Sequence, residues 1–291
     1  MASHDSYEWI YPANVFVLGP NDARTTIVYA TGFVKSVLYG AGLSLDPNSI
    51  RCDSMFGPLL LRGDVRIVLF EHPSRPVDPE IDFPEITRHL RGNVIIGGLS
   101  RGGQVMAQYH RWLLRKWGPD AWRRIALALV STPSCVEDLV QAKMTRRFEQ
   151  FHVPDQLGGP LIRLLGQRLF VTSDAVDLLT DAGRVADIGL LREAIRRSDW
   201  TVATIRELAR FSGFGPPMDV HRRVIVAHVR DDEVVNTKAA TDAAWQTYPG
   251  CILKTIRPTS GHGREDIDVQ AYQEFWQWVF NYCDREFRFS S

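Results

Sequence analysis

The chain has 291 residues, of which 45% are hydrophobic, so it is long enough to bury a large core in one α/β domain that carries an insertion. Lysine plus arginine and aspartate plus glutamate each number 34, and this balance gives no electrostatic basis for binding nucleic acid or an anionic membrane surface. We therefore expect a protein that acts on a small molecule, with no nucleic-acid partner and no membrane span.

The N-terminal segment and the cysteines predict a cytoplasmic setting. Residues 1–9 contain no basic region followed by an apolar stretch, so no secretory signal is expected. The four cysteines lie far apart, without a C-x-x-C pair and without nearby histidines. Neither a zinc site nor a disulfide framework is predicted for them: Cys52, Cys135, Cys251 and Cys283.

Short, nearly continuous apolar runs alternate with helical patterns along most of the chain. Such runs are typical of strands that are buried on both faces, and their alternation with helices predicts a mostly parallel sheet with helices on both sides. The expected strands are residues 15–18, 26–30, 66–70, 94–96, 125–130, 223–229 and 252–256.

The segment from Gly98 to Gly102 has the form G-x-S-x-G and directly follows the apolar run 93–97. This is the pattern of a nucleophile elbow, in which a serine stands on a strained turn between a strand and a helix. Only very small residues allow the close backbone approach on either side of the turn. Residues 104–114 then show apolar positions at helical spacing, so the pattern predicts Ser100 as a nucleophile.

The strand signal stops between about residue 134 and residue 217, where apolar residues recur at helical spacing. The segment 211–217 is rich in glycine and proline and cannot continue a helix, so it is expected to lead back to the sheet. We predict an all-helical insertion here. Near the C-terminus, residues 269–282 place aromatic side chains on one helical face, which predicts a helix packed on the core.

A serine hydroxyl needs a general base, and that base is in turn oriented by an acid. Two later strands are each followed by such a residue. Asp231 and Asp232 follow the strand 223–229, and His262 stands in a loop after the strand 252–256. The order serine, acid, histidine is the one that an elbow of this kind requires.

With these residues the chain resembles the α/β-hydrolase family from about Val15 to Tyr282. The resemblance implies a mostly parallel central sheet, with a core domain of residues 1–133 and 218–291 and a helical lid of residues 134–217. It aligns Asp232, rather than Asp231, with the catalytic carboxylate.

The oxyanion of the tetrahedral intermediate needs prepositioned backbone donors. One is expected to be the amide of Arg101, the residue after the nucleophile. The resemblance implies the amide of Phe33 as the other, because Thr31-Gly32-Phe33 is similar to the family's H-G-x turn, with Thr31 in place of the usual histidine.

Three points stay open at this level. Some family members carry the acid after the sixth strand, where this chain has Glu137 and Asp138. The Arg101 side chain is expected to pair with an acid of the lid, or else to meet an anionic group of the substrate. The other histidines are interpreted as packing or surface residues, with His228 as a hydrogen-bonded core residue and His72 at the presumed active-site end of a strand: His72, His89, His110, His152, His221 and His228.

The sequence therefore predicts a serine hydrolase that cleaves an ester or thioester through an acyl-enzyme, with Ser100, His262 and Asp232 as its triad and a small acyl compound as substrate. Neither a metal nor an organic cofactor is required. The alternatives are an acyltransferase or biosynthetic tailoring enzyme with the same triad, a carbon–carbon bond hydrolase or lyase, and a non-catalytic binding protein on this fold. The oligomeric state does not follow from the sequence.

Overall fold

The structure is a computed structural model that describes residues 8–10, 15–32, 54–71, 77–139, 211, 213–218, 223–258, 262, 265 and 268–288. Most of the predicted helical lid lies outside these residues, as do Phe33 and His72. The division into a core and a lid therefore stays a prediction.

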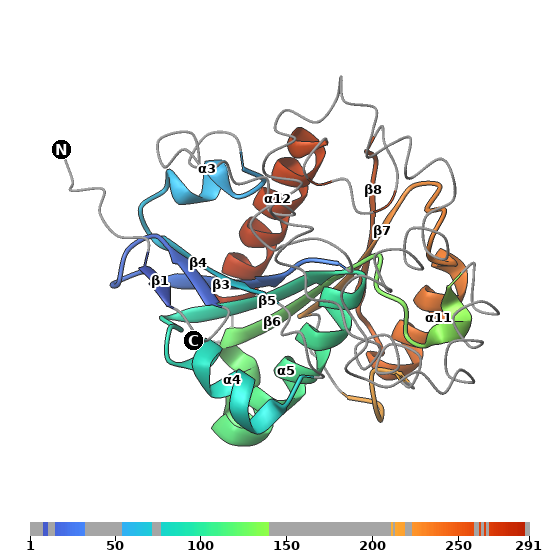
Figure 1. The fold of residues 1–291 in the computed structure, drawn as a ribbon, viewed down its shortest axis with the longest axis horizontal. Helices are drawn as coiled ribbons and strands as arrows, with labels where there is room; N and C mark the ends of the chain where they lie inside the picture. The colour runs from blue at the N-terminus through green and yellow to red at the C-terminus, as the bar shows by residue number, and fades with distance from the viewer. Residues whose placement is uncertain are drawn as a thin grey trace, which may run out of the picture.

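The described residues form an eight-stranded sheet in the order β1-β2-β4-β3-β5-β6-β7-β8 (Figure 1). Strand β2 runs antiparallel to both of its neighbours, and all strands from β4 to β8 pair in parallel. The strands are β1 (Glu8–Ile10), β2 (Val15–Leu18), β3 (Thr25–Ala30), β4 (Val65–Phe70), β5 (Asn93–Leu99), β6 (Ile125–Val130), β7 (Val224–Val229) and β8 (Ile252–Ile256).

The prediction of a mostly parallel sheet with helices on both faces is confirmed. All seven predicted strands are present, and their ends agree within one residue except for β5, which continues to Leu99 instead of ending at Ile96. Strand β1 was not predicted, because three residues at the edge of a sheet leave too short a pattern to detect.

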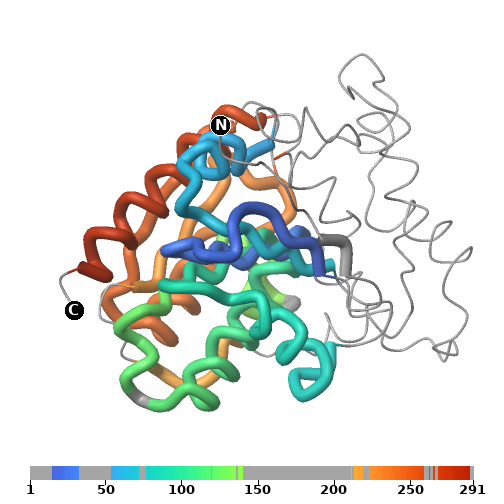
Figure 2. Tube along the Cα trace, turned by 90° about the vertical axis from the view of Figure 1, so that its left-hand side faces the viewer, coloured from blue at the N-terminus to red at the C-terminus, as the bar shows by residue number. Residues whose placement is uncertain are grey.

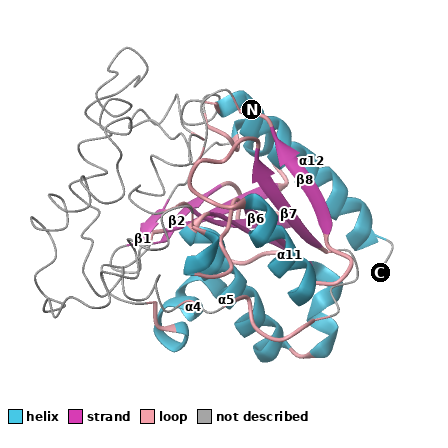
Figure 3. Ribbon diagram, turned by 90° about the vertical axis from the view of Figure 1, so that its right-hand side faces the viewer, coloured by secondary structure: helices cyan, strands magenta, loops and turns pink. Residues whose placement is uncertain are grey.

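Helices lie on both faces of the sheet (Figures 2 and 3), and a layer of buried apolar side chains fills each face. One layer is formed by α3 (Gly57–Leu60) and α12 (Val269–Arg288), and the other by α4 (Pro79–Thr87), α5 (Arg101–Trp117) and α11 (Thr237–Thr247). In Figure 2 the strands lie between the red tube of α12 and the green tube of α5. Strands β3, β4, β6 and β7 are buried at every position, because alternate side chains enter opposite layers.

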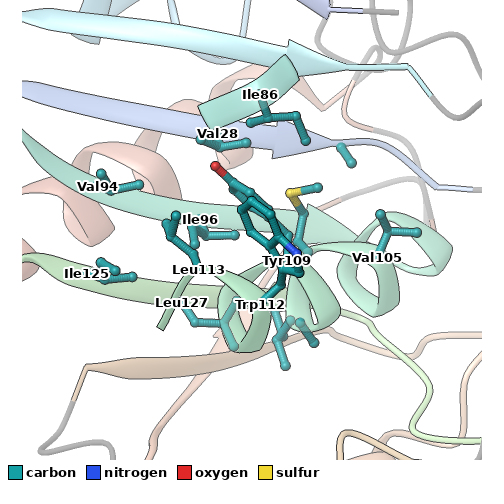
Figure 4. Close-up of a cluster of buried hydrophobic side chains, with 14 of the residues drawn as sticks. Val28, Ile86, Val94, Ile96, Val105, Tyr109, Trp112, Leu113, Ile125 and Leu127 are labelled. Carbon is teal, nitrogen blue, oxygen red and sulfur yellow. The ribbon is translucent and has the colours of Figure 1, made fainter. Parts of the chain in front are cut away.

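The packing of α5 shows how tightly this second layer is built (Figure 4). Tyr109 and Trp112 point from α5 toward the strands, where they meet Val28, Val94 and Ile96. The rings of Tyr109 and Trp112 are stacked, with centroids 6.2 Å apart. Because α5 begins directly after Ser100, this packing fixes the start of the helix, and with it the serine, against the sheet.

Two short helical segments complete the described part. A 3-10 helix, η1 (Pro119–Arg124), precedes β6, and a second, η2 (Val136–Asp138), follows it. Among the described residues no helix is long and apolar enough to cross a membrane, and no group of three or more potential metal ligands is found.

Candidate active site

Ser100 is held at the junction of β5 and α5 in a strained backbone conformation. Its φ of 52° and ψ of −121° are sparsely populated for a residue with a side chain. The amide of Ser100 donates to the carbonyl of Val130 at 2.8 Å, and its carbonyl accepts from the amide of Gly103 at 3.0 Å. Hydrogen bonds to the end of β6 and to the first turn of α5 thus hold Ser100 in its strained conformation, as expected for an elbow.

The two glycines of the motif are required by close backbone contacts. A Cβ at Gly98 would lie 2.5 Å from the carbonyl carbon of Gly102. A Cβ at Gly102 would lie 2.2 Å from the carbonyl oxygen of Ala30 and 2.3 Å from that of Thr31. A larger residue at Gly98 would push against the first turn of α5, and a larger residue at Gly102 would push against the end of β3.

The glycines outside the motif serve the surrounding packing. A Cβ at Gly97 would lie 2.2 Å from the ring of Trp276, so this glycine admits the indole of α12 into the core. A Cβ at Gly103 would lie 1.8 Å from Oγ1 of Thr132. Gly97 and Gly103 therefore leave room for Trp276 of α12 and for Thr132 after β6.

Asp232 and His262 form a buried pair. Oδ2 of Asp232 lies 2.8 Å from Nδ1 of His262, and the two side chains are 0% and 10% exposed respectively. The other carboxylate oxygen, Oδ1, accepts from the amides of Val234 at 3.0 Å and Val235 at 2.8 Å. The amides of its own turn thus hold Oδ1, while Oδ2 faces the imidazole. Because a carboxylate oxygen accepts hydrogen bonds, this contact favours the His262 tautomer that carries its proton on Nδ1.

The electrostatics of this pair favour the ionised acid. Burial acts to raise the pKa of Asp232, but the hydrogen bond and charge of His262, a hydrogen bond from Ser131 and the amide of Val235 together outweigh it. The pKa of Asp232 is therefore lowered. An acid that stays ionised can orient an imidazole and stabilise its protonated form.

Ser131, which the sequence did not single out, supports Asp232 from the neighbouring strand. It follows β6 at a φ of 39°, its hydroxyl oxygen accepts from the amide of Val229 at 3.0 Å, and its hydroxyl acts to lower the pKa of Asp232. The only sign of this role in the sequence is a serine at the end of a buried strand, because its partner lies about a hundred residues away.

Glu233 is a second contributor that the sequence did not single out. The amide of His262 donates to both carboxylate oxygens of Glu233, each at 3.2 Å. Asp232 therefore holds the imidazole while its neighbour holds the backbone of the same residue. Asp231, by contrast, lies exposed in the turn at a φ of 56°, and the structure pairs Asp232 with His262.

The structure brings the three predicted residues to one edge of the sheet, because Ser100, Asp232 and His262 follow the carboxyl ends of the parallel strands β5, β7 and β8. Within the described part of the chain, no hydrogen bond joins the Ser100 hydroxyl to the His262 ring. Such a bond is often long in a free enzyme and tightens when substrate binds.

The oxyanion turn is described as far as Gly32. A Cβ at Gly32 would lie 3.2 Å from Cβ of Ser100, so this turn lies directly beside the serine. The predicted donor Phe33 is outside the described residues. Arg101, the other predicted donor, is 4% exposed and donates from Nη1 to Oε1 of Gln104 at 3.0 Å. Its guanidinium is thus held within the fold at the start of α5.

The alternative acids after β6 are placed differently. Oδ2 of Asp138 accepts from the amide of Ser134 at 2.6 Å and from its hydroxyl at 2.5 Å, so this carboxylate caps the turn before η2. The Glu137 side chain is exposed. Neither arrangement resembles the Asp232 contact with the imidazole.

The structure corrects the expectation that His228 is a hydrogen-bonded core residue. It is buried in β7 as predicted, but neither ring nitrogen has a hydrogen-bond partner among the described residues. Burial lowers its pKa, although the charges of Asp232 and Asp138 act to raise it, so the ring stays neutral and the missing hydrogen bonds cost less. His228 also lines a surface hollow of about 650 Å³ between α11 and β8, which neither Ser100 nor His262 lines.

Comparisons with known proteins identify the fold. No protein-family model matches the chain, and no curated protein matches it in sequence. Solved structures do match over nearly the whole chain. MenH from S. aureus gives a TM-score of 0.57 at 13% identity, covering 93% of this chain and 99% of that chain.

Two further solved structures are similar. A thermophilic esterase from Thermogutta terrifontis gives a TM-score of 0.52 at 16% identity, covering 93% of this chain and 96% of that chain. The Vlm2 thioesterase domain gives 0.53 at 16% identity, covering 92% and 98%. Together with the strand order, these likenesses show that the chain has the α/β-hydrolase fold.

Proposed function

We propose that this protein is a serine hydrolase that cleaves an ester or thioester through an acyl-enzyme. The observation that carries the proposal is the 2.8 Å contact between Asp232 and the Nδ1 of His262, at the same edge of the sheet where Ser100 stands on its strained turn. A binding protein has no need for a buried, ionised acid behind a histidine beside an elbow serine. The esterase and the thioesterase domain with the same fold are consistent with this reaction class.

In the proposed mechanism, Oγ of Ser100 attacks the acyl carbonyl carbon while Nε2 of His262 takes the hydroxyl proton. Asp232 accepts a hydrogen bond from Nδ1–H of His262 and stabilises the imidazolium that forms. The backbone amides of Phe33 and Arg101 donate to the oxyanion of the tetrahedral intermediate. The intermediate collapses as His262 returns the proton to the leaving alcohol or thiol, and water then attacks the acyl-enzyme by the reverse sequence, with His262 as its base.

The predicted lid, residues 134–217, would cover this edge and form the acyl pocket. The small-molecule substrate then reaches Ser100 between the lid and the carboxyl ends of the strands.

The test is covalent labelling with a fluorophosphonate, followed by peptide mapping and by assays with p-nitrophenyl acetate and an acyl thioester. We expect the label on Ser100 and its loss, together with turnover, in Ser100→Ala. Ser54→Ala is the matched control, because Ser54 is a fully buried serine that plays no part in the proposed site. A label on another residue, or equal labelling of Ser100→Ala, would refute the proposal, and transfer of the acyl group to an added amine in preference to water would redefine it as acyl transfer.

A further inference from the structure

Glu265 is a carboxylate buried completely beside the proposed site. It lies three residues after His262, on the same loop, and is 0% exposed. Burying a carboxylate is unfavourable unless hydrogen bonds replace those that it made with water. A buried acid next to a catalytic loop therefore calls for an explanation in terms of its partners.

The partners of Glu265 lie at the carboxyl end of β3. Its Oε1 accepts from Oγ1 of Thr31 at 2.8 Å and from the hydroxyl of Tyr29 at 3.3 Å. Burial, and next to it the charge of Glu265, raise the pKa of Tyr29 well above its ordinary value, so the phenol keeps the proton that it donates. The histidine loop is thereby fastened to a strand more than 230 residues earlier in the chain.

The same end of β3 also contacts the nucleophile elbow. The carbonyl oxygen of Thr31 lies where it would come within 2.3 Å of a Cβ on Gly102, and a Cβ on Gly32 would lie 3.2 Å from that of Ser100. Thr31 thus touches the elbow through its backbone and the histidine loop through its side chain. In the sequence it lies two residues before Phe33, the proposed oxyanion donor.

From these contacts we infer that Glu265 is a positioning residue, which acts with Thr31 as a brace that sets His262 and the oxyanion turn relative to Ser100. The inference rests on the proposed function and adds two residues to its machinery. Asp232 and Glu233 fix the histidine only to the end of β7. The Glu265–Thr31 hydrogen bond ties it to the side of the site that holds the serine, and a displacement of about 1 Å between such groups can lower a rate by about 100-fold.

The test compares two threonines of the same strand region. Thr31→Val removes the hydroxyl that Glu265 accepts from, and Thr31→Ser keeps it. Thr26→Val is the matched control, because Thr26 is equally buried and its hydroxyl is equally engaged, donating to the carbonyl of Arg91 at 2.8 Å and accepting from its amide at 2.7 Å, but at the opposite end of β3.

The readouts are kcat and KM for p-nitrophenyl acetate per active site titrated, and the second-order rate of fluorophosphonate labelling. We expect Thr31→Val to lower kcat and the labelling rate by about 10- to 100-fold with little change in KM, since misplacement acts on the transition state. Thr31→Ser should stay near wild type. Thr26→Val should lose thermal stability to a similar extent yet keep its kcat, which separates positioning from a merely structural role.

Variants of Glu265 provide the second arm. Glu265→Ala should reproduce the loss of kcat, and Glu265→Gln, which keeps an acceptor oxygen, should recover part of it; Thr31→Val in the Glu265→Ala background should then cost little more. If Glu265→Ala does not fold, Thr31→Val alone decides the matter. Wild-type kcat in Thr31→Val, with Ser100→Ala inactive, would overturn the brace and leave the proposed function intact. A wild-type protein that is neither labelled nor active would overturn both.

Discussion

The two edges of the sheet make their turns with different residues. In the described part of the chain, three non-glycine residues have positive φ, namely Ser100, Ser131 and Asp231, and they follow β5, β6 and β7 at the carboxyl edge. At the opposite edge the positive-φ positions next to strands are glycines: Gly19, Gly63, Gly92 and Gly250. The antiparallel direction of β2 places Gly19 on that side.

This difference suits the two edges to different purposes, folding stability at one and the proposed chemistry at the other. A glycine turn adopts positive φ at little cost, whereas each side chain held there costs roughly 1–2 kcal/mol. The amino edge only has to reverse the chain, so glycine serves it best. At the carboxyl edge the strain lies at Ser100 and Ser131, whose hydroxyls have roles in the proposed mechanism, and strained residues of this kind cluster at functional sites.

The largest expected effect tests whether the carboxyl edge is a catalytic site at all. Asp232→Asn replaces the ionised partner of His262 with an amide that can present its donor group to Nδ1 and stabilise the wrong tautomer, so kcat should fall on the order of 10⁴-fold. Esterase assays with titrated active sites measure this. Asp231→Asn is the control, because Asp231 is exposed and asparagine tolerates its positive φ, and its kcat should stay within about two-fold of wild type. A larger loss in Asp231→Asn than in Asp232→Asn would mean that the acid is wrongly assigned.

A second prediction contrasts the glycines of the two edges. In Gly102→Ala the new methyl group would meet the carbonyl oxygens of Ala30 and Thr31, and we expect a loss of about 3 kcal/mol in the free energy of unfolding, together with lower activity. In Gly250→Ala nothing lies within 4 Å of the added methyl group, so only the backbone strain of about 1 kcal/mol applies and activity should be unchanged. Urea unfolding of both variants gives the comparison. Equal losses would show that the elbow relaxes easily.

A third prediction concerns a buried histidine away from the carboxyl edge. His110 lies in α5, where burial, and next to it the charge of Arg111, lower its pKa to about 3. Below about pH 6.5 the unfolded chain binds a proton at this residue and the folded chain does not, so folding stability decreases as the pH falls from 6.5 toward 3. At pH 5 this amounts to about 2 kcal/mol.

His110→Gln removes the titration while keeping a polar side chain of similar size. The difference in free energy of unfolding between wild type and His110→Gln should therefore shift by about 2 kcal/mol in favour of the variant between pH 7 and pH 5. Urea unfolding at several pH values measures it. Parallel curves for the two proteins would show that folding does not lower the pKa of His110.

The local parts of the site could be predicted from the sequence. The elbow at Ser100 is a contiguous pattern, and Asp232 and His262 each follow a recognisable buried strand, so the motif order was sufficient to select them. The strand β5 was predicted too short, because Gly97 and Gly98 have low strand propensity. They are strand residues here since Trp276 and the elbow approach them closely.

The supporting contacts could not be predicted, because each joins segments that only the folded sheet brings together. Ser131 reaches Asp232 and the amide of Val229 about a hundred residues away, and Glu265 reaches Thr31 across more than two hundred. No spacing rule links such residues in one sequence. The same reason applies to His228, which has no hydrogen-bond partner among the described residues: a pattern predicts that a residue is buried but not which groups it contacts.

The smallest expected effects come from Ser131, where two variants separate the cost of the positive φ from the contribution of the hydroxyl. Ser131→Ala and Ser131→Gly both remove the hydroxyl that accepts from the amide of Val229 and acts to lower the pKa of Asp232. Both should therefore lower kcat by about 10-fold, roughly the effect of one interaction with a charged group. Only glycine relieves the φ of 39°, so Ser131→Gly should be more stable than Ser131→Ala by about 1 kcal/mol. Thermal unfolding and esterase assays on the pair measure the two quantities separately. Should Ser131→Gly gain stability without losing activity, the strain at the end of β6 would have no catalytic purpose, and the contrast between the two edges of the sheet would hold for Ser100 alone.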